Sequence, residues 1–379
     1  MRVVLTGGGT GGHIYPALGV AEAWRAQDPG VELFYVGTRR GLESRLVPPT
    51  GIPFYTLSSR PFLRTRPWTA VEAALSAGWG VVEALRLLHQ LRPDLVLATG
   101  GYVCGPLALA AARHRIPLVL QEQNSVPGRT SRYLARYARK IALGFEQARR
   151  HFPARLQDRI VVTGNPVRPE VLAADRQASQ AKLGLNPARR TLLVTGGSQG
   201  AATLNQALLT AYPRLAQRRD LQILWHTGDR PYAAVRQALA GERWQALTMP
   251  GGAQAIRQGN CTLVSYLYDM PAALAAADLV VSRAGALSLA EILVRGIPSI
   301  LVPYPFAADD HQYKNAEVLV TAGAARLVPD AECDGDRLLQ EVQALLDSER
   351  LREQMHQAAL RLARPRATQE IIAVARSVV

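Results

Sequence analysis

Cysteines are few in this sequence of 379 residues, and long apolar runs are absent. The three cysteines, Cys104, Cys261 and Cys333, are odd in number and far apart, which matches neither a disulfide framework nor a CxxC metal site. No apolar run reaches the ~20 residues that cross a bilayer, and Met1 to Leu5 leads into glycines instead of the apolar stretch of a signal peptide. We therefore expect a protein in a reducing, cytosolic setting that is neither exported nor membrane-spanning.

Lysine is also scarce, because it occurs only at Lys140, Lys182 and Lys314 although the formal net charge is +14. Nearly all the positive charge is arginine, a bias that is typical of a genome-wide codon preference. The charge is compatible with nucleic acid, anionic lipid or phosphorylated ligands as partners. The basic residues lack the interleaved aromatic side chains of a stacking platform, so we expect no nucleic-acid partner.

Two similar strand, loop and helix arrangements are present. Arg2 to Leu5 predicts a buried strand, a glycine cluster follows, and a helical pattern begins near Pro16. The arrangement recurs with a strand at Thr191 to Thr195, a loop at Gly196 to Gly200 and a helix at Ala201 to Leu215. A chain of this length with 48% hydrophobic residues can fill two cores, so two domains are expected.

Strands and helices alternate within each half, which predicts two doubly wound α/β domains with parallel sheets that face a cleft. The further expected strands are 32–36, 95–98, 117–120, 160–162, 222–226, 263–266, 279–282 and 299–302, with helices at 71–91, 271–277 and 287–295. Two prolines and a glycine at 164–169 indicate a hinge between a first domain, 1–163, and a second, 170–365. The helix at 366–379 is assigned to the first domain as a hypothesis.

The first glycine cluster, Gly7 to Gly12, is suited to a phosphate, because glycines let backbone N–H groups approach an anion at the positive end of a helix. A dinucleotide-binding dehydrogenase would use the same loop, with Arg39 and Arg40 on an NADP phosphate. His13 follows directly and is our candidate general base, although a capping or packing role is the alternative. The glycine loop at 196–200 favours an enzyme with two anion sites over a dehydrogenase.

Two polar segments follow strands in the second half. Ser282 to Glu291 is a small-residue turn into a helix, where Glu291 can accept hydrogen bonds from ribose hydroxyls or simply complement the helix dipole. Asp309 to Asn315 places acids and amides at the carboxyl edge of the sheet, which suits sugar hydroxyls or an ordinary solvated helix start. Gly100 to Tyr102 and Gln121 to Asn124 occupy the equivalent edge of the first half. Neither a metal motif nor a cofactor motif is evident.

Taken together, these segments resemble the MurG family, the peptidoglycan N-acetylglucosaminyltransferases of the GT-B superfamily. The matching motifs are Gly8 to His13, Gly100 to Tyr102, Glu122 to Asn124, Gly164 to Arg168, Gly196 to Ala201, Ser282 to Glu291 and Gln312, Tyr313 and Asn315. The resemblance extends nearly end to end. It departs at Gln121, where many members have histidine, and at Tyr268, which replaces an acid.

The resemblance implies an inverting, cofactor-independent hexosyltransferase that moves N-acetylglucosamine from UDP-GlcNAc to the MurNAc 4-hydroxyl of lipid I, undecaprenyl-pyrophosphoryl-MurNAc-pentapeptide, and so forms lipid II and UDP. Gly101 and Tyr102 would lie by the acceptor. The donor residues that it implies are Thr10, Gly11, Gly12, Asn124, Arg168, Ser198, Leu267, Ala286, Leu287, Ser288, Leu289, Ala290, Glu291 and Gln312. Within this set, Thr10 to Gly12 border the donor and acceptor phosphates, and Ser198 meets the diphosphate. Arg168 and the Leu267 backbone lie by the uracil, and Glu291 lies on the ribose.

A lipid-linked acceptor requires visits to a membrane surface. Phe62, Leu63, Arg64, Arg66 and Trp68 combine aromatics and arginines without an acid, which predicts a patch for an anionic membrane surface, with an ordinary solvated loop as the alternative. A second basic run comprises Arg129, Arg132, Arg136, Arg139 and Lys140. We thus expect a peripheral protein on the cytoplasmic face of the bacterial inner membrane, with cell-wall synthesis and division proteins as candidate partners.

Three rival functions remain at this point: an NADP-dependent oxidoreductase, a nucleic-acid binder, and another UDP-sugar enzyme on the same architecture, such as a 2-epimerase. The last is the closest competitor, because a fold does not by itself set the reaction.

Overall fold

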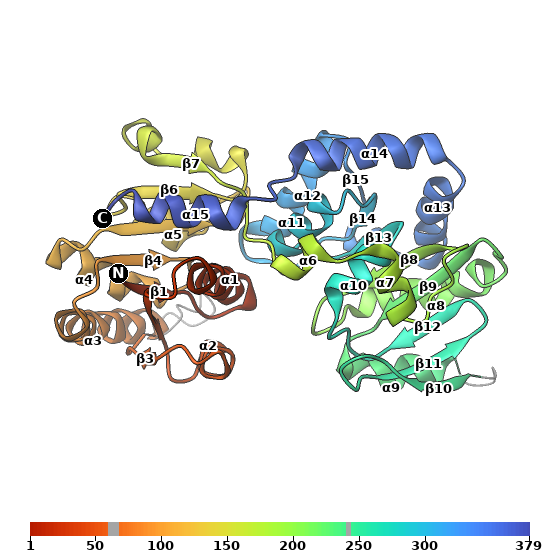
Figure 1. Ribbon diagram of the computed structural model, residues 1–379, viewed down its shortest axis with the longest axis horizontal. Coiled ribbons are helices and arrows are strands. Elements are labelled where there is room, and N and C mark those ends of the chain that lie inside the picture. Colours follow the sequence, from red (N-terminus) through yellow and green to blue (C-terminus); the bar gives the residue numbers. More distant parts are fainter. Residues whose placement is uncertain (60–67, 240–243) are drawn as a thin grey trace. The chain divides into compact units, whose positions relative to one another are not determined.

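The structure is a computed structural model that describes residues 1–59, 68–239 and 244–379, with only the backbone described for 68–75. The chain forms two compact units (Figure 1). Unit 1 comprises Met1–Val167 and Arg364–Val379, and unit 2 comprises Arg168–Ala363. Each unit is built on one sheet with helices on it, and the expected class of two α/β domains is confirmed.

Unit 1 contains a seven-stranded parallel sheet with the order β3-β2-β1-β4-β5-β6-β7. The strands are β1 Arg2–Thr6, β2 Glu32–Gly37, β3 Phe54–Thr56, β4 Leu95–Ala98, β5 Leu118–Glu122, β6 Lys140–Leu143 and β7 Ile160–Val162. The helices are α1 Gly11–Gln27, α2 Glu43–Leu46, α3 Trp68–Leu91, α4 Cys104–His114, α5 Arg129–Leu134 and α15 Ala367–Arg376, with 3-10 turns at Pro48–Thr50, Glu146–His151 and Ala154–Arg159. Because the strand order reverses between β1 and β4, the switch point at which ligands bind in such sheets lies there.

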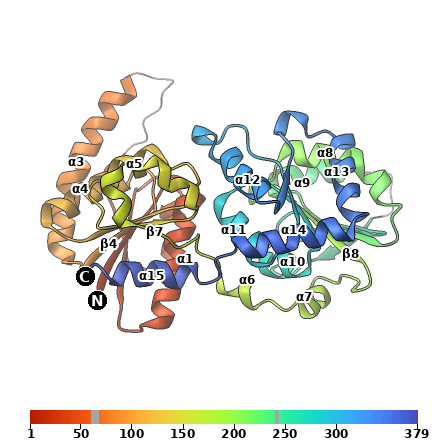
Figure 2. The ribbon, with the colours of Figure 1, turned by 90° about the horizontal axis from the view of Figure 1, so that it is seen from above.

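Both faces of this sheet are covered, which explains why its strands are continuous apolar runs. Alternate residues of β1 point to opposite faces, so Val4 joins the cluster under α3 and α4, while Val3 and Leu5 join the cluster under α1 and α15. Both views show α15, blue, alongside α1 of the same unit (Figures 1 and 2).

Unit 2 contains an eight-stranded sheet with the order β10-β11-β12-β9-β8-β13-β14-β15. The strands are β8 Arg190–Thr195, β9 Leu221–His226, β10 Gln245–Thr248, β11 Gln254–Gln258, β12 Cys261–Val264, β13 Leu279–Ser282, β14 Ser299–Leu301 and β15 Ala325–Leu327. The helices are α6 Pro169–Ala173, α7 Arg176–Lys182, α8 Ala202–Leu215, α9 Asp229–Ala238, α10 Met270–Ala276, α11 Ala286–Val294, α12 His311–Thr321, α13 Gly335–Leu346 and α14 Glu349–Leu362, with 3-10 turns at Ala308–Asp310 and Asp330–Glu332. Its order reverses between β8 and β13.

Several local predictions were wrong. Helix α1 begins at Gly11, not near Pro16, because its N-cap is Thr10, and Pro16 lies inside the helix at the expense of one backbone hydrogen bond. The strand expected at 263–266 is β12, two residues earlier, and β10 and β11 are antiparallel instead of belonging to a wholly parallel sheet.

Candidate active site

The glycine loop of unit 1 connects β1 to α1 at the switch point of its sheet. Gly7 and Gly8 are buried, whereas Gly9, Thr10 and Gly12 are exposed. Thr10 is the N-cap of α1 and makes no side-chain cap bond, so the first turn of a 17-residue helix is presented beyond the sheet edge. The positive end of such a helix favours an anion, so the expectation of a phosphate at this loop stays a prediction.

His13, in this first turn, is oriented by two other loops. Its Nδ1 lies 3.1 Å from the Thr99 carbonyl oxygen and 3.2 Å from Gln123 Oε1. Gln123 Nε2 donates to the same Thr99 carbonyl at 2.7 Å, which fixes the orientation of the amide. Because both partners of Nδ1 are acceptors, the proton of a neutral imidazole belongs on Nδ1, and Nε2 keeps the lone pair that can accept a proton.

The loop after β4 packs directly on the glycine loop. Gly8 N donates to the Gly100 carbonyl at 3.2 Å, and a Cβ on Gly101 would lie 2.2 Å from the Gly8 carbonyl oxygen. Gly101 has a φ of +89°, so it needs glycine for both reasons. The Tyr102 ring lies against Gly9, where a Cβ would approach it to 3.1 Å. The acceptor candidates Gly101 and Tyr102 therefore share one edge with Thr10, Gly11 and Gly12.

Asn124 is positioned by a buried carboxylate that the sequence did not single out as a support. Glu122 accepts hydrogen bonds from Asn124 N at 3.0 Å and from Asn124 Nδ2 at 3.2 Å, and also from Gly128 N at 3.3 Å. The amide group of Asn124 therefore has a defined orientation at the end of β5.

The glycine loop of unit 2 connects β8 to α8 at the second switch point. Thr195 Oγ1 accepts a hydrogen bond from Gly197 N at 3.2 Å and lies 2.9 Å from Nδ1 of the buried His226. Gly197 and Gly200 have φ values of +78° and +73°, which an L side chain rarely adopts. Ser198 is exposed between them, near the start of α8.

Arg168 and Glu291 meet, although they are 123 residues apart in sequence. Arg168 Nε donates to Glu291 Oε1 at 2.6 Å and Nη2 donates to Oε2 at 3.0 Å, which is a bidentate pair. Glu291 is 9% exposed and lies on α11, whose first residue, Ala286, follows the N-cap Gly285. The sequence suggested nucleotide contacts for both residues and gave no sign that they bind each other.

Three further groups lie around the carboxyl edge of this sheet. Gln312 Oε1 accepts from Ala284 N at 3.2 Å and Tyr304 N at 3.0 Å, so it joins the loops after β13 and β14. Arg283 donates to the carbonyls of Val302 and Pro303 and pairs with Asp330, a support that sequence analysis missed. Leu267, whose backbone the resemblance places by the uracil, is a buried residue.

Residues 3–143 match the Glycosyltransferase family 28 N-terminal domain, and residues 191–371 match the Glycosyltransferase family 28 C-terminal domain. A relative from Moorella thermoacetica is 45% identical over 374 residues, which cover 99% of this chain and 98% of that protein. A relative from Lactiplantibacillus plantarum is 41% identical over 379 residues and the full length of both chains. Both bear the name UDP-N-acetylglucosamine--N-acetylmuramyl-(pentapeptide) pyrophosphoryl-undecaprenol N-acetylglucosamine transferase.

Solved structures are similar to this chain as well. The crystal structure of Acinetobacter baumannii MurG has a TM-score of 0.77 and 30% identity, and the match covers 99% of each chain. The chain belongs to the MurG family. A putative UDP-N-acetylglucosamine 2-epimerase from Listeria monocytogenes has a TM-score of 0.66 at 17% identity, covering 100% of this chain and 96% of that one, and this likeness shows the fold alone.

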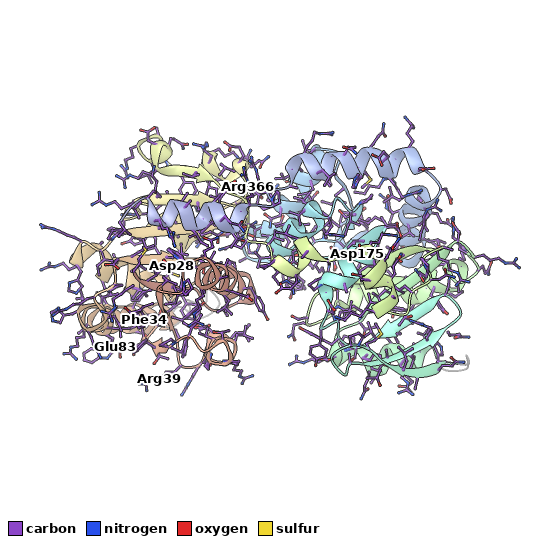
Figure 3. All side chains as sticks on the ribbon, viewed as in Figure 1. Asp28, Phe34, Arg39, Glu83, Asp175 and Arg366 are labelled. Carbon is purple, nitrogen blue, oxygen red and sulfur yellow. The ribbon has the colours of Figure 1, made fainter. Side chains whose placement is uncertain are left out.

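Membership of this family makes the chain a glycosyltransferase, and the oxidoreductase interpretation of the first glycine loop is dropped. Arg39 and Arg40, which that interpretation used, are exposed after β2, and Arg39 is labelled at the surface of unit 1 in Figure 3. In the described part of the chain, no three histidine, cysteine or acidic side chains are grouped as a metal site would require.

Part of the expected membrane patch cannot be placed. Phe62, Leu63, Arg64 and Arg66 lie outside the described residues, and only the backbone of Trp68 is described, at the start of α3. Farther along α3, Trp79 is 58% exposed. Of the second basic run, the Arg136 guanidinium lies 4.1 Å from the Tyr133 ring centroid. None of the helices in the described ranges is long and apolar enough to span a bilayer.

Proposed function

We propose that this chain transfers N-acetylglucosamine from UDP-GlcNAc to the MurNAc 4-hydroxyl of lipid I, with inversion at the sugar carbon, and releases lipid II and UDP. The observation that carries the proposal is the 45% identity, over 99% of the chain, to a relative named for this transfer. The two glycine loops, each at the switch point of its own sheet, supply the two anion sites that such a reaction needs.

Unit 2 holds the donor in this proposal. The Ser198 loop and the start of α8 receive the diphosphate. Arg168 and the Leu267 backbone contact the uracil, Glu291 accepts bonds from the ribose hydroxyls, and Ala286 to Ala290 wrap the nucleotide. Because Gln312 Oε1 is engaged by two backbone N–H groups, its NH₂ is the end that donates to a sugar hydroxyl. Asn124 of unit 1 is assigned to the GlcNAc.

Unit 1 holds the acceptor. Thr10, Gly11 and Gly12 border the phosphates, and Gly101 and Tyr102 contact the acceptor. Nε2 of His13 takes the proton of the 4-hydroxyl as that oxygen attacks C1 of GlcNAc. The bond from C1 to the phosphate oxygen breaks, and UDP leaves with the electron pair. Backbone N–H groups and the helix N-terminus at the Ser198 loop stabilise the charge that develops on UDP.

The direct test is incubation of the purified protein with radiolabelled UDP-GlcNAc and a lipid I analogue. We expect label in a disaccharide-linked lipid and one UDP released for each sugar transferred. Formation of a C2-epimerised UDP-sugar without transfer would instead identify an epimerase and overturn the proposal.

The base is tested by His13→Ala. We expect turnover to fall by about 10²- to 10⁴-fold, because proton transfer by a positioned side chain commonly contributes that much. UDP affinity should be unchanged, since unit 2 holds the nucleotide. His114→Ala, an exposed histidine on α4, is the matched control. Full turnover in His13→Ala would place the base elsewhere.

We also propose that the protein works at the cytoplasmic face of the bacterial inner membrane as a peripheral protein. A lipid-linked acceptor and the cationic, aromatic segment at 62–68 support this location. The same acceptor makes cell-wall synthesis and division proteins candidate partners.

A further inference from the structure

Glu43 is a fully buried acid beside the glycine loop of unit 1. It begins the four-residue helix α2 and has 0% exposure. Its Oε2 accepts from Gly9 N at 3.1 Å, and its Oε1 accepts from Thr38 N at 3.0 Å and Thr38 Oγ1 at 2.7 Å. Among the described residues no cation forms an ion pair with it, so N–H and O–H donors alone hold this carboxylate. Glu43 therefore joins the loop after β1 to the loop after β2.

Three glycines leave room for this side chain. A Cβ on Gly8 would lie 2.8 Å from Glu43 Oε1, one on Gly37 would lie 2.5 Å from Cγ, and one on Gly41 would lie 2.1 Å from Oε1. None of these three glycines has a positive φ, so backbone conformation does not require glycine there. Glu43 supplies the nearest atom at each position, joined by Val103 at Gly8 and Phe54 at Gly37, and at Gly41 all of the nearest atoms belong to Glu43.

The contacts of Glu43 extend to the loop after β4. Thr38 Oγ1, which donates to Glu43, also lies 3.4 Å from the Tyr102 hydroxyl. The Tyr102 ring lies against Gly9, the residue whose N–H Glu43 accepts. All three loops around the switch point between β1 and β4 thus depend on one carboxylate.

We propose that Glu43 is a positioning residue for glycosyl transfer. By holding Gly9 and, through Thr38, Tyr102, it sets the direction of the N–H groups at Gly11 and Gly12 toward the acceptor phosphates. It contacts no substrate itself. The inference rests on the proposed function of this loop. A displacement of about 1 Å in such a group can cost on the order of 10²-fold in rate, so a buried support of this kind controls turnover.

Glu43→Gln tests the proposal, because the amide has nearly the same shape. Its oxygen can still accept from Thr38, but its NH₂ then faces Gly9 N–H, and two donors oppose each other. We expect kcat/KM for a lipid I analogue to fall about tenfold or more, as expected when a buried bond to a charged group is lost. UDP affinity by calorimetry should fall less than kcat/KM does, because the uracil, ribose and diphosphate contacts assigned to unit 2 are unchanged. If Glu43→Gln only reduced the amount of folded protein, kcat/KM calculated per folded molecule would stay at the wild-type value.

Glu83→Gln is the matched control. Glu83, labelled in Figure 3, accepts from Ser58 N at 2.5 Å and Ser58 Oγ at 3.1 Å, so the same charge is removed from a carboxylate in the same unit that does not touch the glycine loop. We expect its kinetics to stay within about twofold of wild type. If folded Glu43→Gln behaves like this control, the proposal is overturned.

Gly41→Ala covers the case in which Glu43→Gln does not fold. The alanine methyl group displaces the Glu43 carboxylate without removing the charge of that carboxylate. The same fall in kcat/KM is therefore expected. Wild-type kinetics in Gly41→Ala would overturn the proposal.

Hydrogen exchange separates this inference from the proposed function. The Gly9 amide should exchange faster in Glu43→Gln than in wild type or Glu83→Gln, whether or not the protein transfers sugar. If wild type makes no lipid II, the proposed function fails. If the Gly9 amide exchanges at the same rate in Glu43→Gln as in wild type, the role of Glu43 is overturned independently of the transfer reaction.

Discussion

Arg168 and Glu291 interact through two hydrogen bonds that leave further lone pairs on the carboxylate. In the proposed donor site, a ribose uses those lone pairs while the arginine holds the carboxylate in place. The pair therefore couples the start of unit 2 to α11, and its value to the enzyme lies in orientation as well as charge.

Glu291→Gln should weaken UDP-GlcNAc binding by about 10- to 100-fold, because bonds to a charged acceptor contribute about 1.5–3 kcal/mol each. Calorimetry measures this. The control is Asp278→Asn, which removes the charge of another pair in unit 2, where Arg176 Nη2 lies 2.8 Å from both carboxylate oxygens. Equal affinities in the two variants would argue against a ribose contact.

His226 makes stability depend on pH. Burial lowers its pKa to about 4 from the ordinary value of 6.5. Between pH 6.5 and pH 4 the unfolded chain binds a proton at this residue and the folded protein does not. The stabilising contribution of neutral His226 is therefore complete above pH 6.5 and is lost as pH falls toward 4. We expect the free energy of unfolding to fall by on the order of 3 kcal/mol across this window.

Urea denaturation at several pH values measures the slope of the free energy of unfolding against pH. His226→Asn should flatten it, whereas His114→Asn, at an exposed histidine, should not. A slope that is identical in wild type and His226→Asn would show that other groups carry the pH dependence.

The chemistry of single residues was partly accessible from sequence. Glycines, His13 and Ser198 form local motifs whose spacing alone predicts loops at strand ends. Glu43 was not found, because its partners Gly9 and Thr38 come from separate loops and no local pattern records that they surround one acid.

At the scale of elements, α15 packs on a unit from which it is distant in sequence. Ile371 and Ala375 are fully buried in the same cluster as Trp24 of α1. Arg376 Nη2 pairs with Asp28 Oδ2 at 3.0 Å at the end of α1. The helix thus completes one face of the unit 1 sheet (Figure 2).

Ile371→Ala should destabilise unit 1 by about 2–5 kcal/mol, through lost apolar contact and a residual cavity. Thermal unfolding should show the loss, while stabilisation by UDP, assigned to unit 2, should persist. Gln369→Ala, exposed on the same helix, is the control. An equal shift in both variants would contradict a core role for α15.

Strands marked by an uninterrupted apolar run were predicted, and strands without one were missed. Strands β4, β7 and β13 match the expected bounds, because an apolar run flanked by polar residues marks a buried strand. Strands β3 and β15 read FYT and ARL, so a polar side chain interrupts or ends each short run and no such pattern marks them. The antiparallel pairing of β10 with β11 depends on the turn at Met249 to Ala253, where the Met249 N–H donates to the Ala253 carbonyl at 3.1 Å.

At the scale of the whole molecule, the net charge of +14 predicts attraction to anionic surfaces. The protein should sediment with vesicles that contain anionic lipid more than with neutral ones, and salt should weaken the effect. Reversing Arg132 and Arg136, on and after α5, changes the charge by four units and should reduce binding on the order of 10²-fold or more, at about 1 kcal/mol per charge.

Reversal of Arg230 and Arg236, both exposed on α9, makes the same change in net charge and serves as the control. Equal loss in both double variants would assign the effect to bulk charge. No difference between anionic and neutral vesicles would remove the proposed membrane contact.

By itself the sequence determined the α/β class and the duplicated strand-loop-helix plan, because apolar periodicity and glycine spacing are local properties of the chain. The family was indicated by the resemblance of its ordered motifs. Only the tertiary structure decided that Arg168 binds Glu291, that His13 presents Nε2, and that Glu43 supports three loops. These are contacts between segments far apart in the chain, and their geometry is set by how strands order and helices pack.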